Sequence, residues 1–175
     1  MNRMIKLVLF FCFISAPLAL SAQDYGTDYS RPGKKLVLSF KTMYGVAGSF
    51  LGETNPVRGV NGDELPWILK SAKGKLFSDG RLIIRIRGLV FPDDPSVPEN
   101  LRGTNDETQF RALVSCLTEE SGAVVEQNVV TEGFPATVKG NSDIVAQIEL
   151  PRPCVAPIVM VLAGSEDKWF SMTGY

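Results

Sequence analysis

Short runs of β-favouring residues, each closed by a turn signal, constrain the fold of this chain more than any other feature. From Pro66 onward, Val, Ile, Leu and Phe gather in runs that Gly, Pro, Asn and Asp separate. These runs cover residues 67–77, 81–91, 110–118, 123–130, 144–150, 155–163 and 168–172, and an earlier strand candidate covers residues 35–42. Because helical periodicity is not sustained after residue 22, we expect an all-β antiparallel domain. An immunoglobulin-like β-sandwich of roughly seven or eight strands is the favoured fold, and a small β-barrel is the alternative.

One hairpin can be placed in register from the sequence pattern alone. Its turn, Ser78-Asp79-Gly80, suits a three-residue loop with Gly80 at positive φ. That register puts only apolar and small residues on one face, in the pairs Leu76–Leu82, Gly74–Ile84 and Ala72–Ile86. A two-residue turn would instead place Lys73 and Lys75 on the apolar face. Since a one-residue slip exchanges the two faces of a strand, the three-residue loop is favoured.

The same register gathers five cations on the opposite face of the hairpin. They are Lys73, Lys75, Arg81, Arg85 and Arg87, with Lys73 directly opposite Arg85. Like charges that face each other across a ladder are mildly destabilising. One explanation is compensation by solvent and by acids on neighbouring strands, with Glu119, Glu126 and Glu149 as the candidates. The other is an anionic partner, such as an acidic polysaccharide or a phosphate-rich surface.

The first 22 residues have the pattern of a secretory signal peptide. Arg3 and Lys6 precede a charge-free apolar run of about 14 residues, and the small-x-small pattern of Ala19-Leu20-Ser21-Ala22 suits cleavage after Ala22. The apolar run is too short to span a bilayer comfortably, so no transmembrane segment is expected. We therefore expect an exported protein, periplasmic or extracellular. Its parts would be a signal peptide over 1–22, a mobile leader over 23–34 and a single β domain over 35–175.

Cleavage at this site would leave two cysteines. Cys12 lies inside the signal peptide, so Cys116 and Cys154 remain. An even number of cysteines in an exported chain predicts a disulfide. The bridge would tie the end of one strand to the entry of a central strand. It would close a loop of about 39 residues, for which loop entropy predicts roughly 4 kcal/mol of stabilisation.

The composition excludes several classes of function. The sequence contains no histidine, which excludes Ser-His-Asp and Cys-His nucleophilic machinery and His-ligated zinc. A disulfide between Cys116 and Cys154 would remove thiolate chemistry as well. Loss of Arg3 and Lys6 leaves 16 cations against 19 acids, a net charge of −3, which argues against a nucleic-acid partner. We expect a non-catalytic protein without a cofactor.

Acidic residues in the predicted loops leave an alternative open. They are Asp63-Glu64, Asp93-Asp94, Asp106-Glu107, Asp143 and Glu166-Asp167. Calcium takes oxygen ligands from flexible loops, but none of these clusters has the spacing of an EF-hand loop. Two carboxylates in one cleft could serve a glycosidase. A small hydrolase that depends on carboxylates or calcium is therefore the first alternative function.

Aromatic residues and one long loop offer further candidate ligand contacts. Trp67 and Trp169, together with Phe170 and Tyr175, could form a platform for stacking sugar rings, although aromatics in β domains more often fill the core. Residues 44–63, rich in Gly, Asn and Pro, predict a long irregular loop that could bind a ligand.

The leading hypothesis is an exported binding or adhesion-type domain. Its partner would be an acidic polysaccharide or another cell-surface component, and it would use the five cations, Trp67 and Trp169. A structural or assembly subunit that donates or accepts an edge strand is the second alternative.

Several short motifs are spread over residues 44–175. They are Leu65-Pro66-Trp67, Asp79-Gly80-Arg81-Leu82, Arg87-Gly88-Leu89-Val90, Phe110-Arg111-Ala112, Val114-Ser115-Cys116, Phe134-Pro135-Ala136 and Pro153-Cys154-Val155-Ala156-Pro157-Ile158-Val159. Together they resemble a group of small exported bacterial proteins that are rich in β-structure. The resemblance implies a β-rich domain that holds Cys116 and Cys154. It implies no activity and no catalytic residue.

Overall fold

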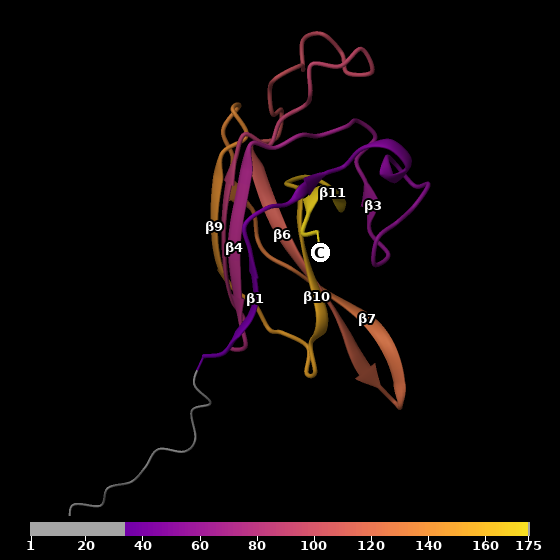
Figure 1. The fold of residues 1–175 in the computed structure, drawn as a ribbon, viewed down its shortest axis with the longest axis vertical. Helices are drawn as coiled ribbons and strands as arrows, with labels where there is room; N and C mark the ends of the chain where they lie inside the picture. The colour runs from indigo at the N-terminus through magenta and orange to yellow at the C-terminus, as the bar shows by residue number, and fades with distance from the viewer. Residues whose placement is uncertain (1–33, 175) are drawn as a thin grey trace, which may run out of the picture. The chain divides into compact units, whose positions relative to one another are not determined.

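The computed structural model describes residues 34–174 as two β-sheets packed face to face (Figure 1). The predicted signal peptide, the predicted leader up to residue 33, and Tyr175 lie outside the described residues. Sheet A has the strand order β1 (Leu36–Phe40), β4 (Ser71–Phe77), β5 (Arg81–Arg87), β9 (Ser142–Gln147). Sheet B has the order β2 (Tyr44–Gly45), β11 (Lys168–Met172), β10 (Val155–Ala163), β6 (Gln109–Glu120), β7 (Ala123–Val130), with β3 (Asn61–Gly62) beside β11 and β8 (Phe134–Pro135) beside β6.

The predicted two-sheet sandwich is confirmed. The barrel alternative is wrong, because the two sheets do not close on each other. Eight strands have five or more residues, and β2, β3 and β8 have two each. The strand pairs are antiparallel except β3 with β11. No helix among residues 34–174 has the length and apolar character needed to cross a membrane.

The predicted β4–β5 register is confirmed residue by residue. Leu76 lies opposite Leu82, Gly74 opposite Ile84, and Lys73 opposite Arg85. Gly80 has φ +84°, as the three-residue turn requires. Both strands are shorter than the predicted runs. Gly88, at φ +67°, interrupts the ladder, which resumes only as a single bridge between Ile68 and Val90.

The core lies between the sheets. Sheet A contributes the apolar face of the hairpin and Ile144, and sheet B contributes alternate residues of its central strands. At one end of the core Trp67 stacks on Phe170 with ring centroids 4.0 Å apart, and Phe91 lies 4.1 Å from Trp67. Burial of so many large apolar side chains is the main stabilisation of the sandwich.

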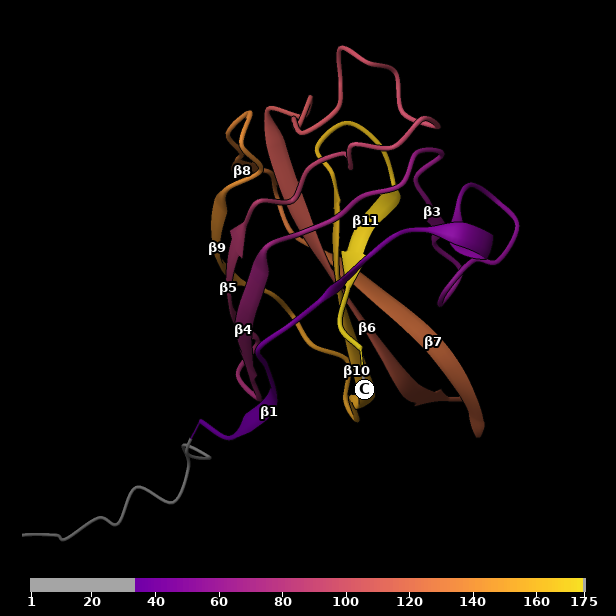
Figure 2. The same ribbon diagram turned by 45° about the horizontal axis from the view of Figure 1, so that its top comes forward.

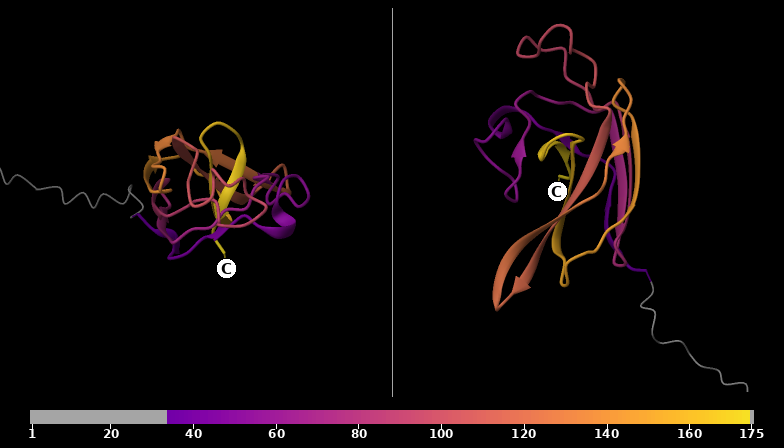
Figure 3. Two further views of the ribbon diagram at one scale, coloured as in Figure 1. Left: turned by 90° about the horizontal axis from the view of Figure 1, so that it is seen from above. Right: turned by 180° about the vertical axis from the view of Figure 1, so that it is seen from behind.

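A third layer covers the face of sheet B that points away from sheet A. We call it the cap segment, residues 46–63, which includes the 3₁₀ turn η1 (Gly48–Phe50) and β3 (Figures 1 and 3). Its ends are tied to β11 by hydrogen bonds from Val46 N to Phe170 O and from Asp63 N to Trp169 O. The predicted long loop is therefore irregular as expected, but it packs on the sheet. This packing explains why β10 is buried on both faces from Ile158 to Ala163.

The predicted disulfide between Cys116 and Cys154 is present. Cys116 lies on β6, and Cys154 immediately precedes β10, whose first residue Val155 pairs with Leu117. The bridge therefore joins two neighbouring strands of sheet B.

Candidate functional site

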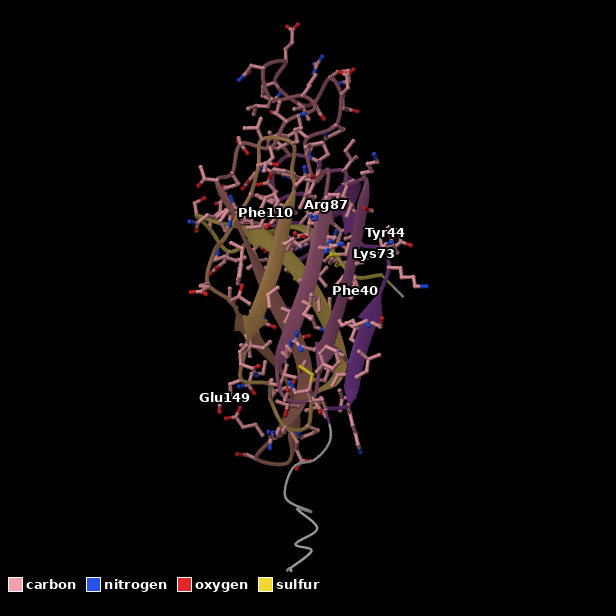
Figure 4. The ribbon with its side chains drawn as sticks, turned by 90° about the vertical axis from the view of Figure 1, so that its left-hand side faces the viewer. Phe40, Tyr44, Lys73, Arg87, Phe110 and Glu149 are labelled. Carbon is pink, nitrogen blue, oxygen red and sulfur yellow. A yellow bond between two sulfur atoms is a disulfide. The ribbon has the colours of Figure 1, made fainter. Side chains whose placement is uncertain are left out.

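The outer face of sheet A concentrates positive charge. Its four strands contain five cations, Lys73 and Lys75 on β4 and Arg81, Arg85 and Arg87 on β5, but a single acid, Asp143 on β9. Figure 4 looks onto this face and labels Lys73 and Arg87 on the two central strands. The five cations that the sequence pattern singled out are thus brought together, on a surface that we call the basic face.

Asp143 is the acid that partly compensates the basic face. It lies directly opposite Arg85 and forms ion pairs with Arg85 at 3.6 Å and with Arg87 at 2.8 Å. The prediction that Glu119, Glu126 or Glu149 compensates the five cations was wrong. Glu119 and Glu126 belong to sheet B, and Glu149 follows the end of β9. β9 lies beside β5 through a long-range connection that the local pattern does not reveal.

Arg87 is held in place by its neighbours. Its guanidinium donates to the carbonyls of Ile86 and Ser142 as well as to Asp143. The hydrogen bond from Arg87 keeps the pKa of Asp143 below its usual value, so this carboxylate is ionised at neutral pH. Among the described residues, no carboxylate comes within ion-pair distance of Lys73, Lys75 or Arg81. Three of the five cations therefore keep their charge available to a ligand.

A shallow depression of about 520 Å³ lies on the basic face. Lys73, Lys75, Arg85 and Lys41 line it, with the half-buried Ile83 between them. Val145, 58% exposed, is the cross-strand neighbour of Ile83. The surface thus combines cationic side chains with a small apolar centre.

Trp67 and Trp169 do not belong to this surface. Each is only 2% exposed, so neither presents a ring face to a ligand. Trp67 lies in the aromatic cluster of the core, and Trp169 lies beneath the cap segment beside Phe50, with ring centroids 6.2 Å apart. Phe170 is equally buried. The stacking platform is therefore not formed by these three rings, which fill the interior instead.

Two of the predicted acidic clusters converge at one end of sheet B. Carboxylate oxygens of Asp63, Glu64 and Glu166 lie within 4.8 Å of one another. The ammonium of Lys168 lies 2.5 Å from Glu64 and 2.9 Å from Glu166. These bonds lower the pKa of Glu64 and raise that of Lys168. The ammonium thus supplies the positive charge that a bound cation would bring.

A groove of about 1110 Å³ opens between the β4–β5 turn, the segment after β9, and β7. Asp79, Gln127, Glu149 and Arg152 line it. Lys34 binds Asp79 at 3.1 Å and lowers the pKa of this carboxyl, which makes Asp79 a poor general acid. Asp63, whose pKa burial raises, is not among the lining residues. Asp63 is therefore not placed to act as the raised-pKa acid of a glycosidase in this groove.

Comparison of the chain with protein-family models, with curated proteins and with solved structures finds no match in any of the three.

Proposed function

We propose that this protein is an exported binding domain whose basic face recognises an acidic polysaccharide. The observation that supports the proposal is the segregation of charge. Sheet A holds five cations and one acid, whereas the whole chain holds 18 cations and 19 acids. The strands of sheet A thus carry a net charge of +4 (five cations against one acid), although the whole chain has a net charge of −1. Concentrated positive charge on one face favours a partner with many negative charges.

The geometry of the face suits a polymer better than a small anion. Neighbouring strands lie about 4.8 Å apart and alternate residues along a strand about 6.8 Å apart, so the cations form a flat grid. A sugar chain with a carboxylate or sulfate on each unit could contact several members of the grid at once. Each contact would be weak and screened by salt, and the sum would give appreciable affinity.

Two features of the chain support export. Residues 1–22 have the composition of a signal peptide, and Cys116 is bridged to Cys154. Structural disulfides persist mainly in oxidising compartments such as the periplasm and the extracellular space. N-terminal sequencing of the protein recovered from those compartments tests this part of the proposal, and Gln23 is the expected first residue.

Retention on an immobilised polyuronate tests the binding proposal. Lys73→Ser with Lys75→Ser removes two cations that have no ion-pair partner among the described residues, so the fold should be preserved. Arg85→Ser with Arg87→Ser removes two more. Each double variant is expected to lower the affinity about tenfold or more, and the retention of the wild type should fall as salt rises.

The matched control is Lys139→Ser with Arg152→Ser, which removes two exposed cations from other surfaces. It changes the net charge by the same amount and should leave retention close to that of the wild type. Equal losses in the control and in the basic-face variants would mean that overall charge, and not this face, determines binding.

A further inference from the structure

Strand β7 forms an exposed edge of sheet B. It is the last strand in the sheet order and pairs with β6 on one side. Figures 1 and 2 show the β6–β7 ribbon reaching away from sheet A, with β7 on the outside. The strand is Val-rich, contains neither Lys nor Pro, and has Glu126 as its single charge. Val124 is 75% exposed and Val130 is 39% exposed. Lys and Pro on an edge strand protect it from pairing with another chain, and long edges that lack them tend to pair with another strand.

The ladder with β6 determines which main-chain groups of β7 face outward. Thr131 N donates to Ala112 O on β6 at 2.8 Å, so residue 131 points its amide towards β6. Main-chain groups alternate in direction along an antiparallel strand. The outward-facing residues are therefore Val124, Glu126, Asn128 and Val130. In the described part of the chain, no main-chain hydrogen bond joins these four residues to a segment outside the strand.

The sequence of β7 is nearly symmetric about its centre. Residues 124–130 read Val-Val-Glu-Gln-Asn-Val-Val, so reversal about Gln127 exchanges only Glu126 with Asn128. We infer that β7 pairs with β7 of a second copy of this chain, antiparallel, on a two-fold axis through Gln127. In that arrangement each protomer presents the same edge to the other, as a closed two-fold dimer requires.

Hydrogen bonding selects this register. Val124 would face the partner's Val130, and Glu126 would face the partner's Asn128. Each such pair exchanges two bonds, so the four pairs of the dimer make about eight main-chain hydrogen bonds. A shift of the axis to Glu126 or to Asn128 leaves one outward residue of each strand unpaired, which reduces the number to about six. The axis at Glu126 would also place two carboxylates directly opposite each other.

The side chains agree with the same register. The exposed Val124 and Val130 would cover each other twice, and Val125 would lie against the partner's Val129 on the opposite face of the sheet. Glu126 would meet an amide instead of a second acid. The cap segment contacts Glu126 through Arg58 at 3.9 Å, and the amide of Asn128 donates to Arg58 O. These are side-chain contacts of β7, and they leave its main-chain edge uncovered.

A two-fold axis of this kind is perpendicular to the sheet, so both copies turn the same face to the same side. The two basic faces would then point in the same direction, and a polymer could contact both. The dimer itself does not rest on the proposed ligand, since it follows from the edge strand alone.

Sedimentation equilibrium of the purified protein tests the inference, with Val124→Lys as the first variant. The wild-type protein is expected to exist in a monomer–dimer equilibrium. Val124→Lys should raise the dimer dissociation constant about tenfold or more, because it places a charge in an apolar cross-strand pair. Val138→Lys is the control: Val138 is 67% exposed but lies outside β7, so the dissociation constant should not change. A monomeric wild type, or equal effects of the two substitutions, would overturn the inference.

Substitution of Asn128 tests the register. Asn128→Glu and Asn128→Lys both remove the amide that donates to Arg58 O, so any effect of that lost bond is common to both. In the proposed register Asn128→Glu sets an acid opposite Glu126 in each of the two Glu126–residue 128 pairs and should abolish the dimer. Asn128→Lys creates opposite-charge pairs and should give a dimer at least as tight as the wild type. Equal dissociation constants for the two variants would contradict the register, with circular dichroism confirming that each is folded.

Discussion

The indole nitrogen of Trp67 donates a hydrogen bond of 2.7 Å to the carboxylate of Asp63 in the interior of the domain. Trp67 is 2% exposed and Asp63 is 9% exposed. Asp63 closes the cap segment, and Trp67 stacks on Phe170 of β11. The bond therefore ties the end of the third layer to the aromatic cluster of the core. An acid that the sequence placed in a loop has a structural role here.

The Asp63–Trp67 pair predicts a specific dependence of stability on pH. Burial raises the pKa of Asp63 above its ordinary value of 3.8, so the folded protein binds this proton more tightly than the unfolded chain does. The contribution of Asp63 to stability is therefore present below pH 3.8 and is lost as the pH rises through the raised pKa. Urea unfolding between pH 3.5 and about 7 measures the effect.

Asp63→Asn should remove this pH dependence and keep the hydrogen bond, since the amide oxygen also accepts. Asp63→Ala should cost about 1–3 kcal/mol, because it leaves the buried indole N–H without a partner. Asp94→Asn is a control in which the pH dependence has the opposite direction. Hydrogen bonds from Ser96 lower the pKa of the exposed Asp94, so the contribution of Asp94 to folding stability is lost as the pH falls. An unchanged pH profile in Asp63→Asn would contradict the assignment.

Gly80 should be far less tolerant of substitution than Gly103. Both have positive φ, +84° and +71°. A Cβ on Gly80 would collide with the carbonyl oxygen of Ile148, whereas a Cβ on Gly103 would meet nothing within 4 Å. Gly103→Ala should therefore cost only the strain of the left-handed conformation, about 1–2 kcal/mol. Gly80→Ala adds a backbone clash, and thermal unfolding of the two variants should show a clearly larger loss.

Removal of the disulfide should cost about 4 kcal/mol, because the bridge closes a long loop in the unfolded chain. Cys116 and Cys154 are 38 positions apart. Guanidinium unfolding of Cys116→Ala with Cys154→Ala, compared with the wild type in the presence and absence of a thiol reductant, measures the loss. The reductant should destabilise the wild type and leave the double variant unaffected. A double variant as stable as the oxidised wild type would contradict the prediction.

Asp143→Asn should strengthen binding to a polyuronate, opposite in direction to loss of the cations. The substitution removes the one carboxylate in the strands of sheet A and releases Arg85 and Arg87 from their ion pairs. Its cost in stability should be small, because Asp143 is 56% exposed. Asp93→Asn, at a site that is 91% exposed in a loop, is the control for net charge. Retention raised equally by both substitutions would argue against a local effect at the basic face.

Local patterns predicted the hairpin and the strands well. The alternation of Ala72, Gly74 and Leu76 with lysines determines which face is buried, and the turn Ser78–Gly80 determines the register. Strands β7, β10 and β11 have the predicted bounds, because turn residues close each run on both sides. The pairing of Cys116 with Cys154 followed from their number.

The positions of Asp143, Trp67 and the cap segment could not be predicted in this way. Asp143 reaches Arg85 because β9 adds to the edge of sheet A across a separation of more than fifty residues. The tryptophans flanked by turn residues are compatible with a surface platform and with a core, and only their packing partners decide between the two. A Gly-rich segment has the same composition whether it lies in solvent or on a sheet.

The sequence by itself determined the β class, the hairpin register, the two-cysteine pairing and the concentration of cations on one strand face. Each of these depends on neighbours along the chain or on the period of two that a pleated strand imposes. Only the tertiary structure decided that residues 46–63 form a third layer, that Trp67 and Trp169 are interior, and that Asp143 borders the basic face. These follow from contacts between distant segments, whose free energy comes from shared burial of apolar surface and is not encoded in any one segment.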